Sequence, residues 1–174
     1  MTPPTTTSSY ALVLGSIGLT SPSGAIPLQA YQKYYNNGPF IYRMARHPGD
    51  VKDGLSFTMF VGETTQNDAP QTMNSWALGV AYLSSLRSTT NPMNSLPDNG
   101  GIIPLTIANS GLSVDGETVM GGFASSHSAG SNFAFGDRHV SFLSELVNFP
   151  IYQALSTIAG SEPIDPTLFN QASK

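Results

Sequence analysis

Few side chains in this sequence could perform acid–base or nucleophilic chemistry. The histidines are His47, His127 and His139, and the chain contains no cysteine. A serine nucleophile needs a sharp turn that exposes it, and no G-x-S-x-G pattern provides one. No H-E-x-x-H, Walker A or G-x-G-x-x-G pattern occurs either. We therefore expect a protein that is not an enzyme. A hydrolase built around His127, Asp137 and Glu63 is kept as a third hypothesis, after the two that are given at the end of this subsection.

Acidic residues in turns are the second group that could do chemistry. Carboxylate oxygens gathered in turns are ligands for Ca²⁺. Asp115, Glu117 and Asp137 lie in predicted turns and are the candidate calcium ligands. The EF-hand spacing is absent, and Asp before Gly commonly serves turn formation alone. Calcium is thus the one cofactor considered, and none is assigned.

The composition indicates where the protein acts. Charged residues make up 10% of the 174 residues, against about 25% in an average soluble domain. Neutral polar residues replace them, which is typical of exported proteins and assembly subunits. The net charge is −4 and the basic residues are scattered, so the basic stripe that nucleic acid requires is missing. We expect an extracytoplasmic protein that binds no nucleic acid.

The chain is expected to form one β-rich domain. The apolar run Tyr10–Leu19 has about half of the ~20 residues that span a bilayer. No basic segment precedes it, so it does not read as a signal peptide. Residues 1–9 are expected to be a linker or an artificial start, and residues 10–174 a single globular domain. The 13 prolines and 17 glycines favour strands, loops and short helices.

Several segments have patterns specific enough to predict. The alternation in Ser56–Glu63 predicts a strand. Residues 132–135 and 140–143 are expected to form a β-hairpin around Gly136-Asp137-Arg138-His139. A strand or short helix is expected at 10–19, a strand at 40–42, and two short strands around Asp115-Gly116. A helix is expected from Asn148, its cap, to Gly160. Residues 76–86 are left undecided between strand and helix.

The segment 123–145 (FASSHSAGSNFAFGDRHVSFLSE) resembles the C-terminal motif of a family of bacterial pilin-like proteins that is expanded in planctomycetes. That motif places His nine residues before Asp-Gly, in a context such as S-x-H-P-G-G-A-N-F-x-F-A-D-G-S-V-R-F. His127 and Asp137 have this spacing, and Gly130 and Asn132 also match. Ser128-Ala129 replaces Pro-Gly and Arg138 replaces Gly. Because Arg accepts a positive φ poorly, we expect a different turn geometry there.

Two further segments support the resemblance. Residues 51–63 (VKDGLSFTMFVGE) are similar to the family's I-T-D-G-T-S-N-T-I-x-V-G-E. Residues 152–162 (YQALSTIAGSE) are similar to Y-x-A-L-x-T-x-x-G-G-E, and Ser9-Tyr10 before an apolar run is a weaker match. Phe57 departs from the pattern, where the family has Asn. The positions that match within 51–63 are Asp53, Gly54, Ser56, Thr58, Gly62 and Glu63.

The resemblance implies a fold and a function. The fold would be a pilin-like α+β head with an antiparallel sheet, long loops and short helices, without the family's N-terminal transmembrane helix. The family is similar to the major pseudopilins of type II secretion and type IV pilus systems. The implied function is a non-catalytic subunit that is anchored in the inner membrane and assembles with other pilin-like subunits into a filament.

The motif residues are expected to act as scaffolding. Glu63 ends an apolar strand and is expected to be partly buried and paired with Arg138 or His127. His127 and Asn132 are expected to satisfy backbone groups around a loop. The alternative function is an exported module that binds glycans or peptides through exposed aromatic residues. The candidates for that role are Tyr31, Tyr34, Tyr35 and Trp76.

Overall fold

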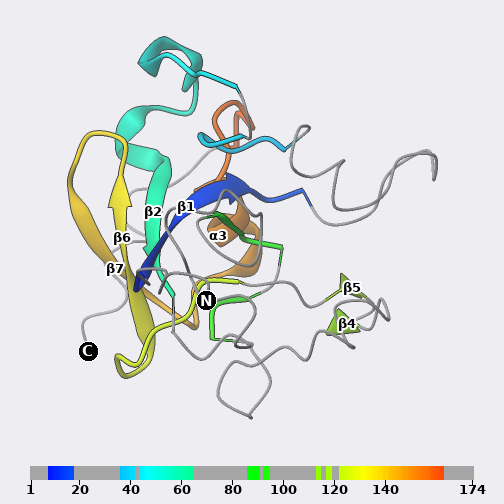
Figure 1. The fold of residues 1–174 in the computed structure, drawn as a ribbon, viewed down its shortest axis with the longest axis vertical. Helices are drawn as coiled ribbons and strands as arrows, with labels where there is room; N and C mark the ends of the chain where they lie inside the picture. Colours follow the sequence, from blue (N-terminus) through cyan, green and yellow to red (C-terminus); the bar gives the residue numbers. More distant parts are fainter. Residues whose placement is uncertain are drawn as a thin grey trace, which may run out of the picture.

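A mixed five-stranded sheet organises the described part of the chain in the computed structural model (Figure 1). The strand order is β3-β1-β2-β6-β7. The described residues are 8–17, 36–41, 44–64, 86–90, 92–94, 113–114, 117–118 and 122–162. The strands of the sheet are β1 (Tyr10–Gly15), β2 (Met59–Glu63), β3 (Leu86–Ser88), β6 (Gly130–Phe135) and β7 (Val140–Ser144). The 3₁₀ turns η1 (Pro48–Asp50) and η2 (Leu55–Phe57) precede β2, and the helix α3 (Phe149–Ala154) follows β7.

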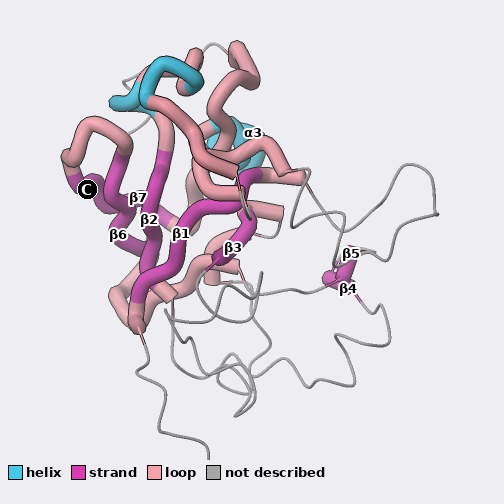
Figure 2. Tube along the Cα trace, turned by 45° about the horizontal axis from the view of Figure 1, so that its top comes forward, coloured by secondary structure: helices cyan, strands magenta, loops and turns pink. Residues whose placement is uncertain are grey.

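The sequence predicts an antiparallel sheet, but the observed sheet is mixed. Strands β1, β2, β6 and β7 pair antiparallel in that order, but β3 lies parallel to β1. A parallel pair cannot be joined by a tight turn. Strand β2 lies between β1 and β3 in the chain, so no local turn pattern reveals their pairing. Figure 2 shows β3 at one edge of the sheet and the β6–β7 hairpin at the other. A mixed sheet with few helices is compatible with the predicted α+β class.

One face of the sheet carries the core. Alternate residues of β6, Ser131, Phe133 and Phe135, are buried, because successive side chains of a strand point to opposite faces. Phe133 makes an edge-to-face contact with Phe123, with 5.2 Å between ring centroids. α3 covers this face beside β1 (Figure 1). The buried cluster consists of Ala11, Val13, Met59, Met93, Phe123, Phe133, Phe135, Leu143, Tyr152 and Leu155.

The predicted helix at 148–160 is shorter than expected. Asn148 is the N-cap residue and Pro150 lies in the first turn, as predicted, although the Asn148 side chain makes no capping hydrogen bond. The helix ends at Ala154, and Gly160 does not terminate it. Leu155 and Ile158 are nevertheless buried. After Ala154 the backbone carbonyls bond outside the helix: Leu155 O accepts a hydrogen bond from the Met59 N–H at 2.7 Å.

Other predicted elements have mixed outcomes. The β6–β7 hairpin is confirmed, and so is the antiparallel pair β4 (Ser113–Val114) and β5 (Glu117–Thr118). The strand predicted at Ser56–Glu63 begins only at Met59, because residues 55–57 form η2. The strand predicted at 40–42 is wrong within the described residues, where Ile41 makes only an isolated bridge to Met44. Trp76 and the rest of 76–85 lie outside the described residues.

The turn after β6 holds a residue other than glycine in the left-handed backbone region. Arg138 has φ of 80°, so the expected change of geometry is wrong. Ala129 (φ 63°) and Ser161 (φ 60°) also occupy the left-handed region. All three stand where the family pattern has Gly. Three residues other than glycine therefore hold a conformation that favours glycine, at a cost of about 1–2 kcal/mol for each residue.

Substituting glycine at these positions should stabilise the protein. We expect Arg138→Gly, Ala129→Gly and Ser161→Gly each to raise the free energy of unfolding by about 1 kcal/mol, because the left-handed strain exceeds the entropy that glycine adds to the unfolded chain. Urea unfolding measures the change. Arg138→Ala is the matched control, since it removes the charge but retains a Cβ. An equal gain in Arg138→Ala would contradict this explanation.

Candidate functional site

The pairing of β2 with β6 brings the two main motif segments together. Met59 lies opposite Phe135 and Gly62 opposite Phe133, in an antiparallel arrangement. The end of segment 51–63 therefore meets the first half of β6, and residues 55–59 meet the end of β6 and the turn that follows it. A side chain at Gly62 would collide with the rings of Phe123 and Phe133, both within 2.5 Å of its Cβ. Glycine here permits the rings to pack onto the strand.

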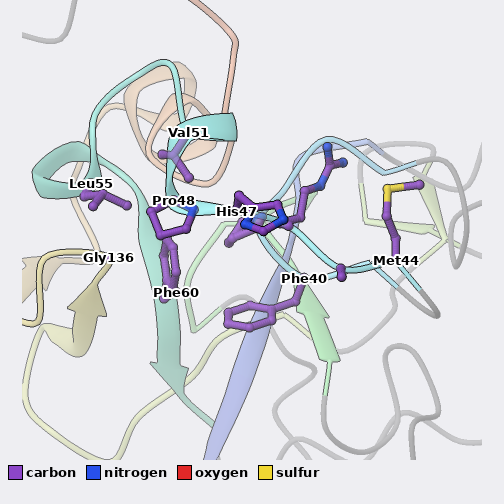
Figure 3. Close-up of a pocket in the computed structure, with 11 residues that line it drawn as sticks. Phe40, Met44, His47, Pro48, Val51, Leu55, Phe60 and Gly136 are labelled. Atoms are coloured by element: carbon purple, nitrogen blue, oxygen red, sulfur yellow. The ribbon is translucent and has the colours of Figure 1, made fainter.

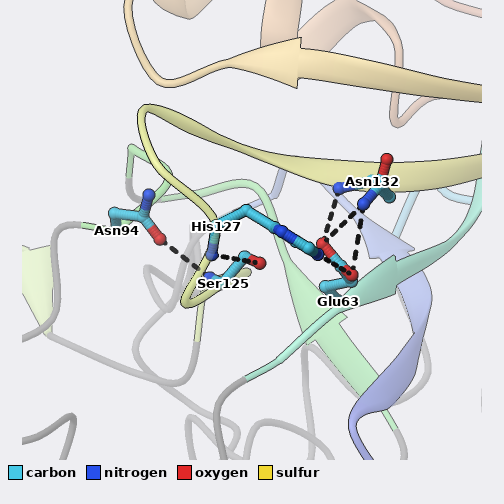
Figure 4. Close-up of polar contacts among 5 residues, drawn as sticks. All are labelled: Glu63, Asn94, Ser125, His127 and Asn132. Atoms are coloured by element: carbon cyan, nitrogen blue, oxygen red, sulfur yellow. Dashed lines mark hydrogen bonds and ion pairs between the residues drawn. The ribbon is translucent and has the colours of Figure 1, made fainter.

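Glu63 is the centre of the polar cluster at one end of this pairing (Figure 4). Its Oε2 accepts a hydrogen bond from the Asn132 backbone N–H at 2.7 Å, and both oxygens lie 3.3 Å from Asn132 Nδ2. His127 Nε2 lies 3.4 Å from Glu63 Oε1. The predicted pairing of Glu63 with His127 is thus confirmed. Arg138, the other predicted partner, lies in the turn beyond the far end of β6.

The cluster stabilises a largely buried carboxylate. Glu63 has a side chain 11% exposed and His127 one 60% exposed. Burial acts to raise the pKa of Glu63. The hydrogen bonds from the Asn132 N–H and side chain, one from Ser125 and the charge of His127 together outweigh burial and hold this pKa below its usual value. The ionised form of Glu63 is therefore the one that the fold favours.

Two residues that the sequence did not single out hold the loop around this cluster. Asn94 Oδ1 accepts from the Ser125 N–H at 2.9 Å, and Ser125 Oγ accepts from the His127 N–H at 3.2 Å. Asn94 itself has φ of 56°. It belongs to a segment rich in Asn, Pro and Ser that predicts only a surface loop. An asparagine within it carries no signal that its partner is 31 residues away.

Asp53 joins the first motif segment to the C-terminal one. Its Oδ2 accepts from Thr157 Oγ1 at 2.9 Å and from the Gly160 N–H at 2.8 Å, and its Oδ1 accepts from the Ser161 N–H at 2.8 Å. Thr58 is buried, and its hydroxyl lies 3.3 Å from Thr157 O. These contacts tie residues 157–161 to the segment before β2.

Asp137 lies at the opposite end of β6 from His127 and Glu63. The His139 backbone N–H, the His139 ring (Nδ1 at 2.6 Å from Oδ1) and the Ser56 hydroxyl hold its pKa below the usual value. The six-residue strand β6 separates it from His127. The structure therefore does not assemble the His127, Asp137 and Glu63 cluster that the hydrolase hypothesis requires.

The remaining motif residues have backbone roles. Gly54 adopts φ of 94° at the start of η2. A side chain at Gly130 would run into Leu143 O and the Phe142 ring. Nothing in these positions presents a reactive group.

A cavity of about 300 Å³ opens beside the sheet, away from the Glu63 cluster (Figure 3). Phe40 and Phe60 meet edge to face within its wall, with ring centroids 5.4 Å apart. A register shift between Met59 and Val61 makes Phe60 the extra residue of β2, and such bulges re-aim side chains. The mainly apolar lining also includes Met44, His47, Pro48, Val51, Leu55 and Gly136.

The metal and glycan candidates are only partly within view. Asp115, Tyr31, Tyr34, Tyr35 and Trp76 lie outside the described residues. Of Glu117 the structure describes only its place in β5. Within the described ranges, no three His, Asp or Glu side chains come close enough together to hold a metal ion. The same ranges contain no helix that is long and apolar enough to cross a membrane.

Neutralising Glu63 should weaken the fold in a pH-dependent way. A carboxylate whose pKa is lower in the folded state than in the unfolded state stabilises the fold at pH values above its unfolded pKa of about 4.3. This stabilisation is lost as the pH falls through the folded-state pKa. We expect Glu63→Gln to lower the free energy of unfolding by about 1–2 kcal/mol at pH 7. At about pH 3 the gap should narrow towards zero. Urea unfolding at both pH values tests this, with exposed Glu162→Gln as control; an equal gap at both would refute it.

Comparison with known proteins gives one match. A model of a protein family described as "Protein of unknown function (DUF1559)" matches residues 16–149. No curated protein and no solved structure matches the chain. The matched range covers most of the chain, including β2, the whole β6–β7 hairpin and the polar cluster between them. The chain belongs to the DUF1559 family.

Proposed function

We propose that this chain is the non-catalytic, extracytoplasmic head of a pilin-like subunit. A helix outside these 174 residues would hold the subunit in the inner membrane and pack with other subunits into a secretion or pilus-type filament. The motif segments support a structural role, because the carboxylates of Asp53 and Glu63 accept hydrogen bonds from backbone N–H groups, that of Asn132 among them, and so hold loops closed.

The observation that carries the proposal is the open face of the sheet. Across four strands, Leu12 lies opposite Val61, Val61 opposite Ala134, and Ala134 opposite Val140. These residues alternate with the buried ones, so their side chains share the face away from the core. The first three are half-buried and Val140 is 65% exposed. An apolar row of this kind suits an apolar or amphipathic helix laid across it.

Charging this face should block assembly and leave the head folded. In the full-length protein in its own cells, we expect Ala134→Asp to reduce surface filaments about tenfold, because an unpaired charge would be buried at the contact. Ser126→Asp, at an exposed position outside the sheet, is the matched control. Filaments are counted after shearing, and urea unfolding of the purified head should change by less than about 1 kcal/mol.

Two results would count against the proposal. One is a full-length wild-type protein found in the cytoplasm instead of the membrane fraction. The other is normal filament formation by Ala134→Asp.

A second candidate function is an exported module that binds peptides. The cavity beside Phe40 and Phe60 favours it, since about 300 Å³ is at the lower end of ligand pockets. An aromatic side chain would meet ring edges and aliphatic groups there.

The cavity is tested with a small aromatic probe. We expect N-acetyl-phenylalanine amide to shift the NMR signals of Phe60 and Gly136, and Phe60→Ala to weaken its binding about tenfold through lost ring contact. Phe149→Ala, at a ring outside the cavity lining, is the control. Failure of the probe to shift these signals at millimolar concentration would exclude this site for aromatic side chains.

A further inference from the structure

The two edges of the sheet differ in how they are protected. At one edge, all three residues of β3 are buried. At the other, β7 contains one buried residue, Leu143, and Val140 is the most exposed. Exposed edge strands usually carry a charge, a proline or a bulge that prevents pairing. β7 has the sequence VSFLS and a regular register with β6, so it has none of these devices.

The hydrogen-bonding pattern identifies which groups of β7 face outward. Phe135 N–H bonds to His139 O, and Glu145 N–H bonds to Ala129 O. Bonded pairs alternate along an antiparallel ladder, so Ser141 and Leu143 also direct their N–H and C=O groups to β6. The backbone groups of Val140, Phe142 and Ser144 therefore point away from the sheet. Among these, the described structure gives a backbone partner only to Ser144 O, which accepts from the Val147 N–H.

We propose that β7 pairs antiparallel with β7 of a second copy of this chain, about a two-fold axis at Phe142. In this register Phe142 faces its own copy and Val140 faces Ser144, so all three outward-facing residues are used. The same register places His139 opposite Glu145. The sheets of the two copies become continuous, and their open apolar faces lie side by side.

Charge at the ends of β7 selects this orientation. Arg138 and His139 precede the strand and Glu145 follows it. Antiparallel pairing sets His139 beside Glu145, whereas parallel pairing would put Glu145 beside Glu145 and Arg138 beside Arg138. His139 Nδ1 already contacts Asp137, which leaves its Nε2 to meet the carboxylate of the other copy. Glu145 contacts Asn94 through Oε2, and its Oε1 is available.

The pairing is tested on the 174-residue chain by sedimentation velocity from about 10 µM to about 1 mM. We expect a reversible dimer, with amide exchange of Val140 and Phe142 slowing as the concentration rises. Val140→Pro removes an N–H that has no partner among the residues that the structure describes, at a strand start where proline is tolerated. It should weaken the dimer about tenfold, because two symmetry-related hydrogen bonds disappear. Val140→Ala keeps the N–H and should still dimerise.

A charge exchange gives an independent test. Glu145→Lys should weaken the dimer several-fold, and His139→Glu added to Glu145→Lys should restore it, because the two residues that face each other again carry opposite charges. A chain that stays monomeric at about 1 mM, or a dimer unaffected by Val140→Pro, would overturn the proposal. Either result would leave the pilin-like function standing, since anchoring and filament formation do not require β7 pairing.

Discussion

The antiparallel pairing of β2 with β6 is the interaction on which the rest of the structure depends. It sets Glu63 beside Asn132 at one end, and Leu55 O beside the Asp137 N–H at the other. Without it, a largely buried carboxylate would lose its donors and the loops at both ends would lose their closure. The two segments that resemble a pilin-like family are thus one structural unit in space, and Asp53 adds the C-terminal segment to the same unit.

Three residues other than glycine adopt left-handed backbone conformations in the motif segments. Ala129, Arg138 and Ser161 hold positive φ angles at positions where the family pattern has glycine. The chain tolerates the strain because neighbouring hydrogen bonds, such as Glu145 N–H to Ala129 O, hold each turn in place.

Within the described part of the chain, one face of the sheet packs against the core, the other face is apolar and partly exposed, and edge strand β7 has no outer partner strand. This asymmetry fits the assembly role proposed above. A face that shows Leu12, Val61, Ala134 and Val140 gains free energy when a partner covers it, at about 25 cal/mol for each Å². The scarcity of charge in the sequence belongs to the same description, because neutral polar surfaces permit close approach of subunits. Catalysis would require a convergence of reactive groups, and within the described residues His127 and Asp137 lie at opposite ends of β6.

The sequence by itself determined the local elements and the residues that matter. Turn residues and alternation predicted the β6–β7 hairpin and the core of β2, and the motif spacing identified Asp53, Glu63, His127, Asn132 and Asp137. Only the tertiary structure decided which of these residues meet. The parallel β3, the Asn94 contact and the Phe60 bulge all depend on segments distant in sequence, and local patterns do not encode such pairings. Helix α3 also ends earlier than its sequence predicts, because the carbonyls of Leu155 and Ile158 accept hydrogen bonds from the Met59 and Lys52 N–H groups instead of from the helix.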